Sequence, residues 1–173
     1  MVNLEKSAWI SKLSSSPLGV IWIAVSENGL AAIEIHPEKD RIIKQLDKMG
    51  FKRIIEDAER VSPICKQILD YLTGKRRTFD LDIDWSSMGH FQQNALKATL
   101  AIPFGKTATY QDIAQQINAP RAARAVGRAE ATNPIPLVIP CHRVIGADGK
   151  LHGYGGGKGI ETKAWLLQLE KGG

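Results

Sequence analysis

The feature that most constrains this chain is a change of sequence pattern around residues 85–89. Before it, apolar and β-branched segments alternate with Ser, Gly and Pro turns, whereas after it apolar residues recur at helical spacing. A chain of 173 residues has room for two small domains. We therefore expect an N-terminal α+β domain over residues 1–87 and a mostly helical C-terminal domain over residues 88–173.

The N-terminal half predicts a small antiparallel sheet of three or four strands with one or two helices. Strand signals cover residues 9–13, 19–25, 30–35 and, as an acidic edge strand, 80–84. The Asn28-Gly29 pair predicts a hairpin turn, because both residues tolerate positive φ. Helical spacing begins after Pro37, and a second helix is expected from Ser62, as its cap, to Leu72.

The C-terminal half predicts a helix-turn-helix. After a helix from His90 to Ala101, Thr109 and Asp112 have the spacing of a capping box that starts a short helix. Asn118-Ala119-Pro120 ends that helix, and Pro120 suits the first turn of the next one, Arg121 to about Ala131. Two helices joined by such a turn favour a helix-turn-helix domain of the winged-helix-like kind.

The net positive charge of the chain comes from this second half. The chain has a formal net charge of +5, and residues 1–87 carry as many acidic as basic side chains. An excess in one domain indicates an anionic partner, of which nucleic acid is the commonest large one. From charge alone, a solvated basic face without a partner is an equal alternative.

The second helix of the motif combines small residues with arginines. The small ones are Ala122, Ala123 and Gly127, and the basic ones are Arg121, Arg124 and Arg128. The arginines are three and four residues apart, so they share one face. A small-residue helix can approach a DNA groove closely while its arginines reach phosphates or bases. The alternative is a packed helix whose arginines lie in water.

Several classes of protein are excluded or disfavoured by composition. No apolar run is long enough to span a membrane, and the N-terminus lacks a secretory pattern, so we expect a cytoplasmic protein. The two cysteines, Cys65 and Cys141, form neither a disulfide framework nor a CxxC pair, which favours a reducing compartment. Cys and His residues do not cluster at ligand spacing, so no metal site is expected.

The segment from Asn133 to Val144 carries the chemistry. Three prolines stiffen an apolar run that delivers Cys141 next to His142 and Arg143. A neighbouring His or cation can populate the thiolate that a reactive cysteine needs. A buried structural cysteine is the alternative for such a dipeptide taken alone. The glycine-rich run 153–159 lacks the spacing and the Ser or Thr of a phosphate loop.

Taken together, these motifs resemble the O6-alkylguanine-DNA alkyltransferases, also called methylated-DNA–protein-cysteine methyltransferases. The resemblance covers most of residues 88–170. It rests on Ile102–Thr107, Thr109-Tyr110, Arg124–Gly127, Pro140–Val144, Gly153–Gly157 and Lys163–Leu167. It implies a ribonuclease-H-like N-terminal domain and a C-terminal domain that binds DNA and accepts the alkyl group.

The resemblance implies a mechanism that uses each protein molecule once. Cys141 would attack the alkyl carbon on guanine O6 and keep the alkyl group as a thioether, with no cofactor. His142 would draw the thiol proton through a bridging water, and Glu170 would orient that histidine. Asn133 would hold the tight turn around the site.

The resemblance also implies how double-stranded DNA containing O6-alkylguanine is bound. A monomer would place the helix Arg121–Ala131 in the minor groove, with Ala122, Ala123, Gly127, Arg121 and Arg128 at the DNA. Arg124 would fill the gap left by the flipped base, and Tyr110 would push the adjoining phosphate and recognise the guanine. Backbone groups of Cys141 and Val144 would accept from the guanine amine, and Tyr154 and Gly155 would shape the lid.

Two other functions compete with this interpretation. A non-catalytic helix-turn-helix protein, such as a lesion sensor or regulator, would share Arg124 and the basic domain. A cysteine hydrolase would use Cys141 repeatedly, but no signature of such a family surrounds it. Stoichiometric transfer to Cys141 separates the three hypotheses.

Overall fold

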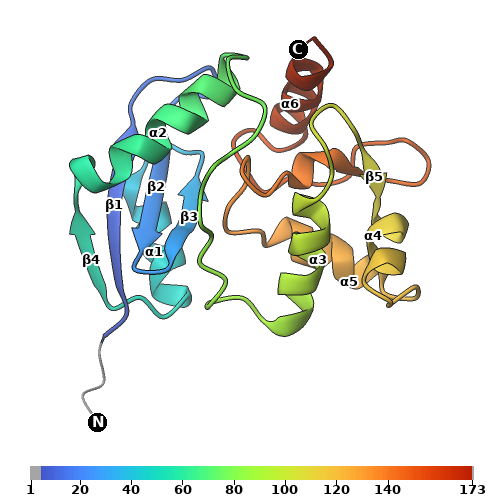
Figure 1. The fold of residues 1–173 in the computed structure, drawn as a ribbon, viewed down its shortest axis with the longest axis horizontal. Coiled ribbons are helices and arrows are strands. Elements are labelled where there is room, and N and C mark those ends of the chain that lie inside the picture. The colour runs from blue at the N-terminus through green and yellow to red at the C-terminus, as the bar shows by residue number, and fades with distance from the viewer. Residues whose placement is uncertain (1–4, 173) are drawn as a thin grey trace. The chain divides into compact units, whose positions relative to one another are not determined.

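The computed structural model describes residues 5–172 and contains two compact units, residues 1–87 and 88–173 (Figure 1). Each unit combines helices with a small sheet, so the fold class is α+β. None of the helices in the described residues is long and apolar enough to cross a membrane.

The N-terminal unit is built on a four-stranded mixed sheet. Its strands are β1 (Ser7–Leu13), β2 (Ile21–Ser26), β3 (Gly29–Glu34) and β4 (Arg53–Glu56), in the order β3-β2-β1-β4. The β1–β2 and β2–β3 pairs are antiparallel, but β4 lies parallel to β1. The expectation of a purely antiparallel sheet was therefore wrong. A crossover containing helix α1 (Lys39–Lys48) separates β3 from β4, and such a connection permits parallel pairing.

The hairpin between β2 and β3 differs from the expected turn. Ser26 pairs with Gly29, so the loop residues are Glu27 and Asn28 rather than Asn28 and Gly29. Gly29 has a φ of 123°, and an added Cβ would collide with the backbone of Asp82. The glycine is required both by its positive φ and by that close approach.

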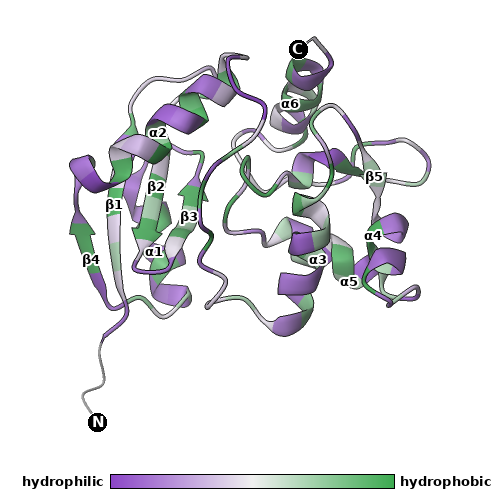
Figure 2. Ribbon diagram, in the orientation of Figure 1, coloured by the Kyte–Doolittle hydropathy of each residue, from purple (hydrophilic) through white to green (hydrophobic). Residues whose placement is uncertain are grey.

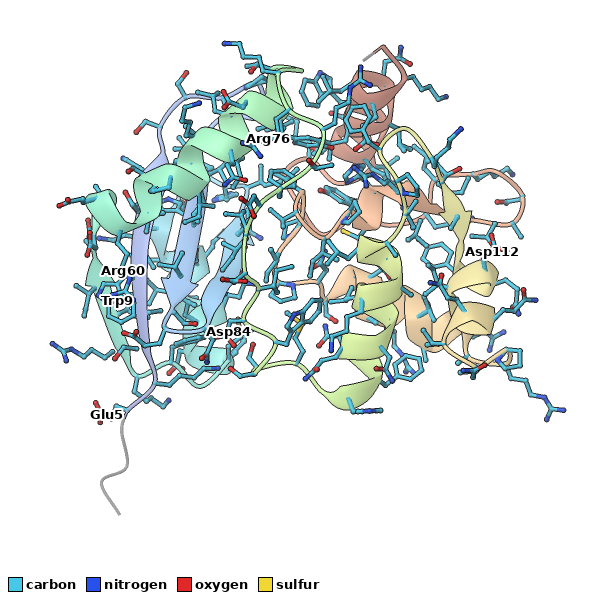
Figure 3. All side chains as sticks on the ribbon, viewed as in Figure 1. Glu5, Trp9, Arg60, Arg76, Asp84 and Asp112 are labelled. Atoms are coloured by element: carbon cyan, nitrogen blue, oxygen red, sulfur yellow. The ribbon has the colours of Figure 1, made fainter. Side chains whose placement is uncertain are left out.

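Residues 80–84 form no edge strand. They meet β3 through one isolated bridge between Ile83 and Leu30. The Asp84 carboxylate is buried and accepts a hydrogen bond from the Ser26 hydroxyl at 2.5 Å (Figure 3). A buried acidic side chain interrupts the outward polar pattern that favoured a strand.

Helices α1 and α2 (Ala58–Leu72) cover opposite faces of the sheet (Figure 1). Figure 2 shows the alternation of hydrophilic and hydrophobic residues along α2. Its cap is Asp57, which accepts from the Arg60 N–H, so the helix begins before the expected cap Ser62. Pro63 lies inside the helix and cannot donate to the Glu59 carbonyl, which accepts from the Ser62 hydroxyl at 3.1 Å instead.

The C-terminal unit has a core formed by three packed helices. The elements are α3 (His90–Leu100), β5 (Ala108–Thr109), α4 (Tyr110–Gln116), α5 (Ala123–Ala131), the 3₁₀ helix η1 (Cys141–Arg143), β6 (Val144–Ile145) and α6 (Ile160–Gly172). Apolar residues of α3, α4 and α5 form one cluster that includes Ala95, Ile113 and Val126. The short strands β5 and β6 pair in parallel.

The predicted capping box is confirmed. The Thr109 hydroxyl accepts from the Asp112 N–H at 3.0 Å, and the Asp112 carboxylate accepts from the Thr109 N–H at 2.8 Å. Asp112 is labelled in Figure 3. These two bonds satisfy N–H groups that the first turn of a helix leaves without partners, so local sequence determines where α4 begins.

Helix α5 begins later than the sequence pattern predicts. Its first residue is Ala123, so Arg121 and Ala122 lie before the helix. Pro120 is the second residue of a turn closed by the Ala122 N–H on the Ala119 carbonyl at 2.8 Å, a position that proline favours. The helical arginine face therefore contains Arg124 and Arg128 without Arg121.

Candidate active site

The segment leading to Cys141 is a buried loop held by one amide side chain. Asn133 accepts from the Ile135 N–H at 2.9 Å, and its Nδ2 donates to the Ile139 carbonyl at 3.0 Å. Leu137 between them adopts a φ of 74°. Both ends of the Asn133 amide are used, so the loop has a defined path to the cysteine that follows.

Cys141 begins η1 and lines a cavity of about 420 Å³. Cys141 is 5% exposed. The other residues that line the cavity come from α4, from α5 and from the segment after β6. Of the residues predicted for DNA or substrate, those at the cavity are Tyr110, Ala123, Arg124, Gly127 and Tyr154. A cavity of this size can take a small ligand such as a nucleobase.

Other predicted residues lie outside the cavity lining. These are Arg121, Ala122, Arg128, Val144 and Gly155. Arg121 and Arg128 are exposed, whereas the Val144 side chain is completely buried. A Cβ at Gly155 would lie 3.0 Å from the Ala131 carbonyl oxygen, so the glycine permits a close backbone approach. The lid residues Tyr154 and Gly155 thus have different surroundings.

The pKa of the Cys141 thiol is raised, whereas a nucleophile that is ionised before it reacts has a lowered pKa. Burial, and to a smaller extent the charge of the nearby Glu130, raise the pKa of the thiol to about 12. A hydrogen bond from Asn133 and the charge of Lys163 act in the opposite direction. The thiol is therefore protonated at neutral pH, and nucleophilic attack requires that its proton be removed.

His142, Arg143 and Glu170 form a buried network behind the cysteine. Glu170 Oε1 lies 2.8 Å from His142 Nε2 and accepts from Arg143 Nη2 at 2.9 Å. Arg143 Nε donates to Oε2 at 3.0 Å, and Nη1 donates to the Ile102 carbonyl at 2.6 Å. The N–H of Gly105 donates to Oε2 at 2.9 Å. These charged and N–H donors stabilise the ionised form of Glu170.

The charge state of His142 follows from its burial. The side chain is completely buried, and burial lowers its pKa, although Glu170 opposes that shift. The imidazole is thus neutral near pH 7. Because an ionised Glu170 can only accept, the neutral ring carries its proton on Nε2, which leaves Nδ1 as the basic nitrogen.

Lys163 of α6 was not predicted as a site residue, yet its hydrogen bonds connect segments around the cavity. Its buried ammonium donates to the carbonyls of Val144 at 2.6 Å and His152 at 2.9 Å. The Tyr110 hydroxyl donates to the same His152 carbonyl at 3.3 Å. Lys163 and Tyr110 therefore hold the segment that carries Tyr154.

Glu130 of α5 was also missed, and it lines the cavity together with Cys141. It is 6% exposed, and its Oε1 lies 2.5 Å from the Thr99 hydroxyl oxygen. Burial raises the pKa of Glu130 to about 7.

A signal for both missed residues, Glu130 and Lys163, exists in the sequence. Glu130 lies four residues after Val126, and Lys163 three before Leu166, so both stand on apolar stripes.

Comparison with protein families supports the resemblance over the whole chain. Residues 90–172 match the DNA binding domain of 6-O-methylguanine DNA methyltransferase, and residues 10–85 match its ribonuclease-like domain. The methylated-DNA–protein-cysteine methyltransferase of Methanosarcina barkeri is 42% identical over 90% of this chain and 93% of its own length. The inducible enzyme of that name from Bacillus subtilis is 39% identical over 87% and 83%.

Solved structures agree. The structure of Mycobacterium tuberculosis OGT in complex with DNA is 38% identical, covers 96% of this chain and 93% of that one, and gives a TM-score of 0.79. The O6-methylguanine-DNA methyltransferase of Pyrococcus kodakaraensis is 25% identical, covers 94% and 98%, and gives a TM-score of 0.65. On these matches, the chain belongs to the 6-O-methylguanine DNA methyltransferase family.

Proposed function

We propose that this protein repairs DNA directly, by moving an alkyl group from guanine O6 to the sulfur of Cys141. The carrying observation is a buried thiol at the wall of a cavity whose other walls include the second helix of a helix-turn-helix. A carbon–sulfur bond forms as the carbon–oxygen bond breaks, and the thiol proton passes to the guanine. The resulting thioether is stable, so each molecule reacts once and needs no cofactor.

The network behind Cys141 supports a route for the proton. His142 is neutral and donates from Nε2 to Glu170, so its Nδ1 can take up the thiol proton through a bridging water. Arg143 and the Gly105 N–H hold Glu170 in place, so Glu170 can orient the histidine. Asn133 holds the loop and hydrogen-bonds the thiol.

We expect α5 and the exposed arginines around it to contact the DNA. Arg124 is exposed and lines the cavity, so it can enter the duplex in place of a flipped guanine. Small residues Ala123 and Gly127 let α5 approach a narrow groove, which favours the minor groove. Exposed Arg121 and Arg128 can contact the flanking phosphates. We propose a cytoplasmic monomer as the acting form.

A mass measurement tests this function. The protein is incubated with a duplex containing O6-methylguanine, and its intact mass is determined. We expect a gain of one methylene per molecule, which stops at one equivalent. The gain is lost in Cys141→Ala and kept in Cys65→Ala. Folded protein that gains no mass would favour the non-catalytic sensor, and product beyond one equivalent would favour a hydrolase.

A further inference from the structure

The segment after β6 brings a histidine to the cavity. Residues 146–150 form a tight turn, in which the Gly146 N–H donates to the Lys150 carbonyl at 3.0 Å and the Gly149 N–H donates to the Gly146 carbonyl at 2.9 Å. The chain then returns to the cavity, and His152 lines it together with Gly146. The transfer reaction as proposed does not use the imidazole of His152.

The backbone of His152 is fixed from two elements. Its carbonyl accepts from Lys163 Nζ at 2.9 Å and from the Tyr110 hydroxyl at 3.3 Å. The Lys163 ammonium is buried and also donates to the Val144 carbonyl at 2.6 Å, so α6 holds both ends of the segment 144–152. Tertiary contacts therefore set where the histidine meets the cavity.

The ring of His152 is held as well as its backbone. Its Nε2 lies 3.3 Å from Asp148 Oδ1, an oxygen that also accepts from the Lys150 N–H at 3.0 Å. The bond from Lys150, followed by the bond to His152, lowers the pKa of Asp148, so this carboxylate is ionised near neutral pH and can only accept. A Cβ at position 146 would collide with Nε2 and with the same carboxylate oxygen, so Gly146 provides the space that the pair occupies.

The second ring nitrogen of His152 is open to an added group. The side chain is 54% exposed, and Nδ1 has no hydrogen-bond partner among residues 5–172. Because the Asp148 carboxylate can only accept, Nε2 carries a proton. A doubly protonated ring would then donate from Nδ1, and an anion is the best acceptor for such a bond.

The surroundings of His152 indicate which anion this is. Of the polar side chains that line the cavity, those of Arg124 and His152 are exposed, whereas Cys141 is buried. When a nucleotide is flipped, its base enters the pocket and its phosphates remain in the DNA backbone. An exposed side chain at the cavity therefore meets a phosphate rather than the alkyl group.

We propose that the His152 imidazolium, oriented by Asp148, hydrogen-bonds a backbone phosphate directly beside the flipped guanine and so positions that nucleotide for transfer. This inference rests on the proposed function. The two ring nitrogens face different directions, so the carboxylate and the phosphate each meet one of them. The contact binds the DNA backbone and leaves the chemistry at Cys141 unchanged.

The test removes one phosphate charge at a time. Duplexes containing O6-methylguanine carry a neutral methylphosphonate at the linkage on the 5′ or the 3′ side of that nucleotide, and intact mass gives the second-order rate constant of methyl transfer. At one of the two linkages, the ratio of rates on unmodified and neutral duplex should be about tenfold larger for wild type than for His152→Ala. A purely structural role of His152 would slow the variant equally on both duplexes and leave this ratio unchanged.

Two variants of the same turn complete the test. Lys150→Ala removes an exposed charge and should keep the wild-type ratio at the sensitive linkage. Asp148→Asn keeps an oxygen that accepts from the Lys150 N–H but removes the charge beside the ring, so its ratio should fall below that of the wild type. If the wild type transfers methyl but shares one ratio with His152→Ala at both linkages, the inference is overturned while the function stands. If the wild type transfers no methyl group, both fall.

Discussion

Two buried glutamates of the C-terminal unit have opposite surroundings. Glu170 accepts hydrogen bonds from His142, Arg143 and Gly105, and its neighbours are cationic or donors. Glu130 is held at one oxygen by Thr99, and its other oxygen is buried without a hydrogen-bond partner among the described residues. One carboxyl is an ionised anchor and the other is poised between two protonation states. The same residue type is therefore held by several charged or donor groups in one place and by a single hydroxyl in the other.

Replacing each glutamate by leucine should show this difference most strongly. Glu170→Leu leaves the buried Arg143 without its counter-charge, so we expect a loss of about 3–5 kcal/mol in the free energy of unfolding. At pH 4.5, where the Glu130 carboxyl is protonated in the folded state, Glu130→Leu should change it by less than about 1 kcal/mol, because the Thr99 hydroxyl keeps the Ala95 carbonyl as an acceptor. Urea unfolding measures both. Equal losses would mean that Glu130 is a second structural anchor.

The pH dependence of stability should depend on Glu130. Its pKa is raised by burial from 4.5 to about 7, so between these values the folded state keeps a proton that the unfolded state has released. This contribution is complete below pH 4.5 and is lost as pH rises through about 7, a change of about 3 kcal/mol.

Unfolding of wild type and Glu130→Gln at pH 4.5 and pH 8 isolates that contribution. The difference in unfolding free energy between the two proteins should shift by the stated amount, with the wild type relatively weaker at pH 8. A difference that stays constant with pH would show that Glu130 titrates like an exposed carboxyl.

A milder change at the anchor should affect chemistry rather than DNA binding. Glu170→Gln keeps the size of the side chain but weakens its hold on His142, so we expect transfer to slow about 100-fold. Affinity for a duplex should remain within about twofold, since Glu170 is buried away from the solvent. Single-turnover kinetics and a binding titration give the two values. A parallel loss of affinity would instead assign Glu170 to the shape of the DNA-binding surface.

The smallest effect is expected at Arg124, an exposed residue that lines the cavity. Arg124→Ala should reduce both DNA affinity and transfer rate about tenfold, because no side chain then fills the gap that the flipped base leaves in the duplex. Arg128 lies one turn further along α5, outside the cavity lining, and provides the matched control. Arg128→Ala should weaken affinity while the rate at saturating DNA stays unchanged. Equal rates for wild type and Arg124→Ala would contradict the insertion role.

Local signals in the sequence predicted elements whose causes are local. The capping box placed the start of α4, since its two hydrogen bonds join residues three positions apart. The same reasoning placed the starts of α2 and α5 wrongly, because Asp57 supplies a better cap than Ser62 and because Pro120 belongs to a turn. The parallel direction of β4 was missed, since strand patterns carry no direction.

The amino-acid sequence by itself determined the α+β class, the location of the net positive charge in residues 88–173 and the motif around Cys141 that resembles an alkyl acceptor. Only the tertiary structure decided what surrounds that cysteine. His142 meets Glu170 across 28 positions, and Glu130 meets Thr99 across 31. The loss of solvent that sets each pKa comes from distant segments packed together, and no local pattern contains that information.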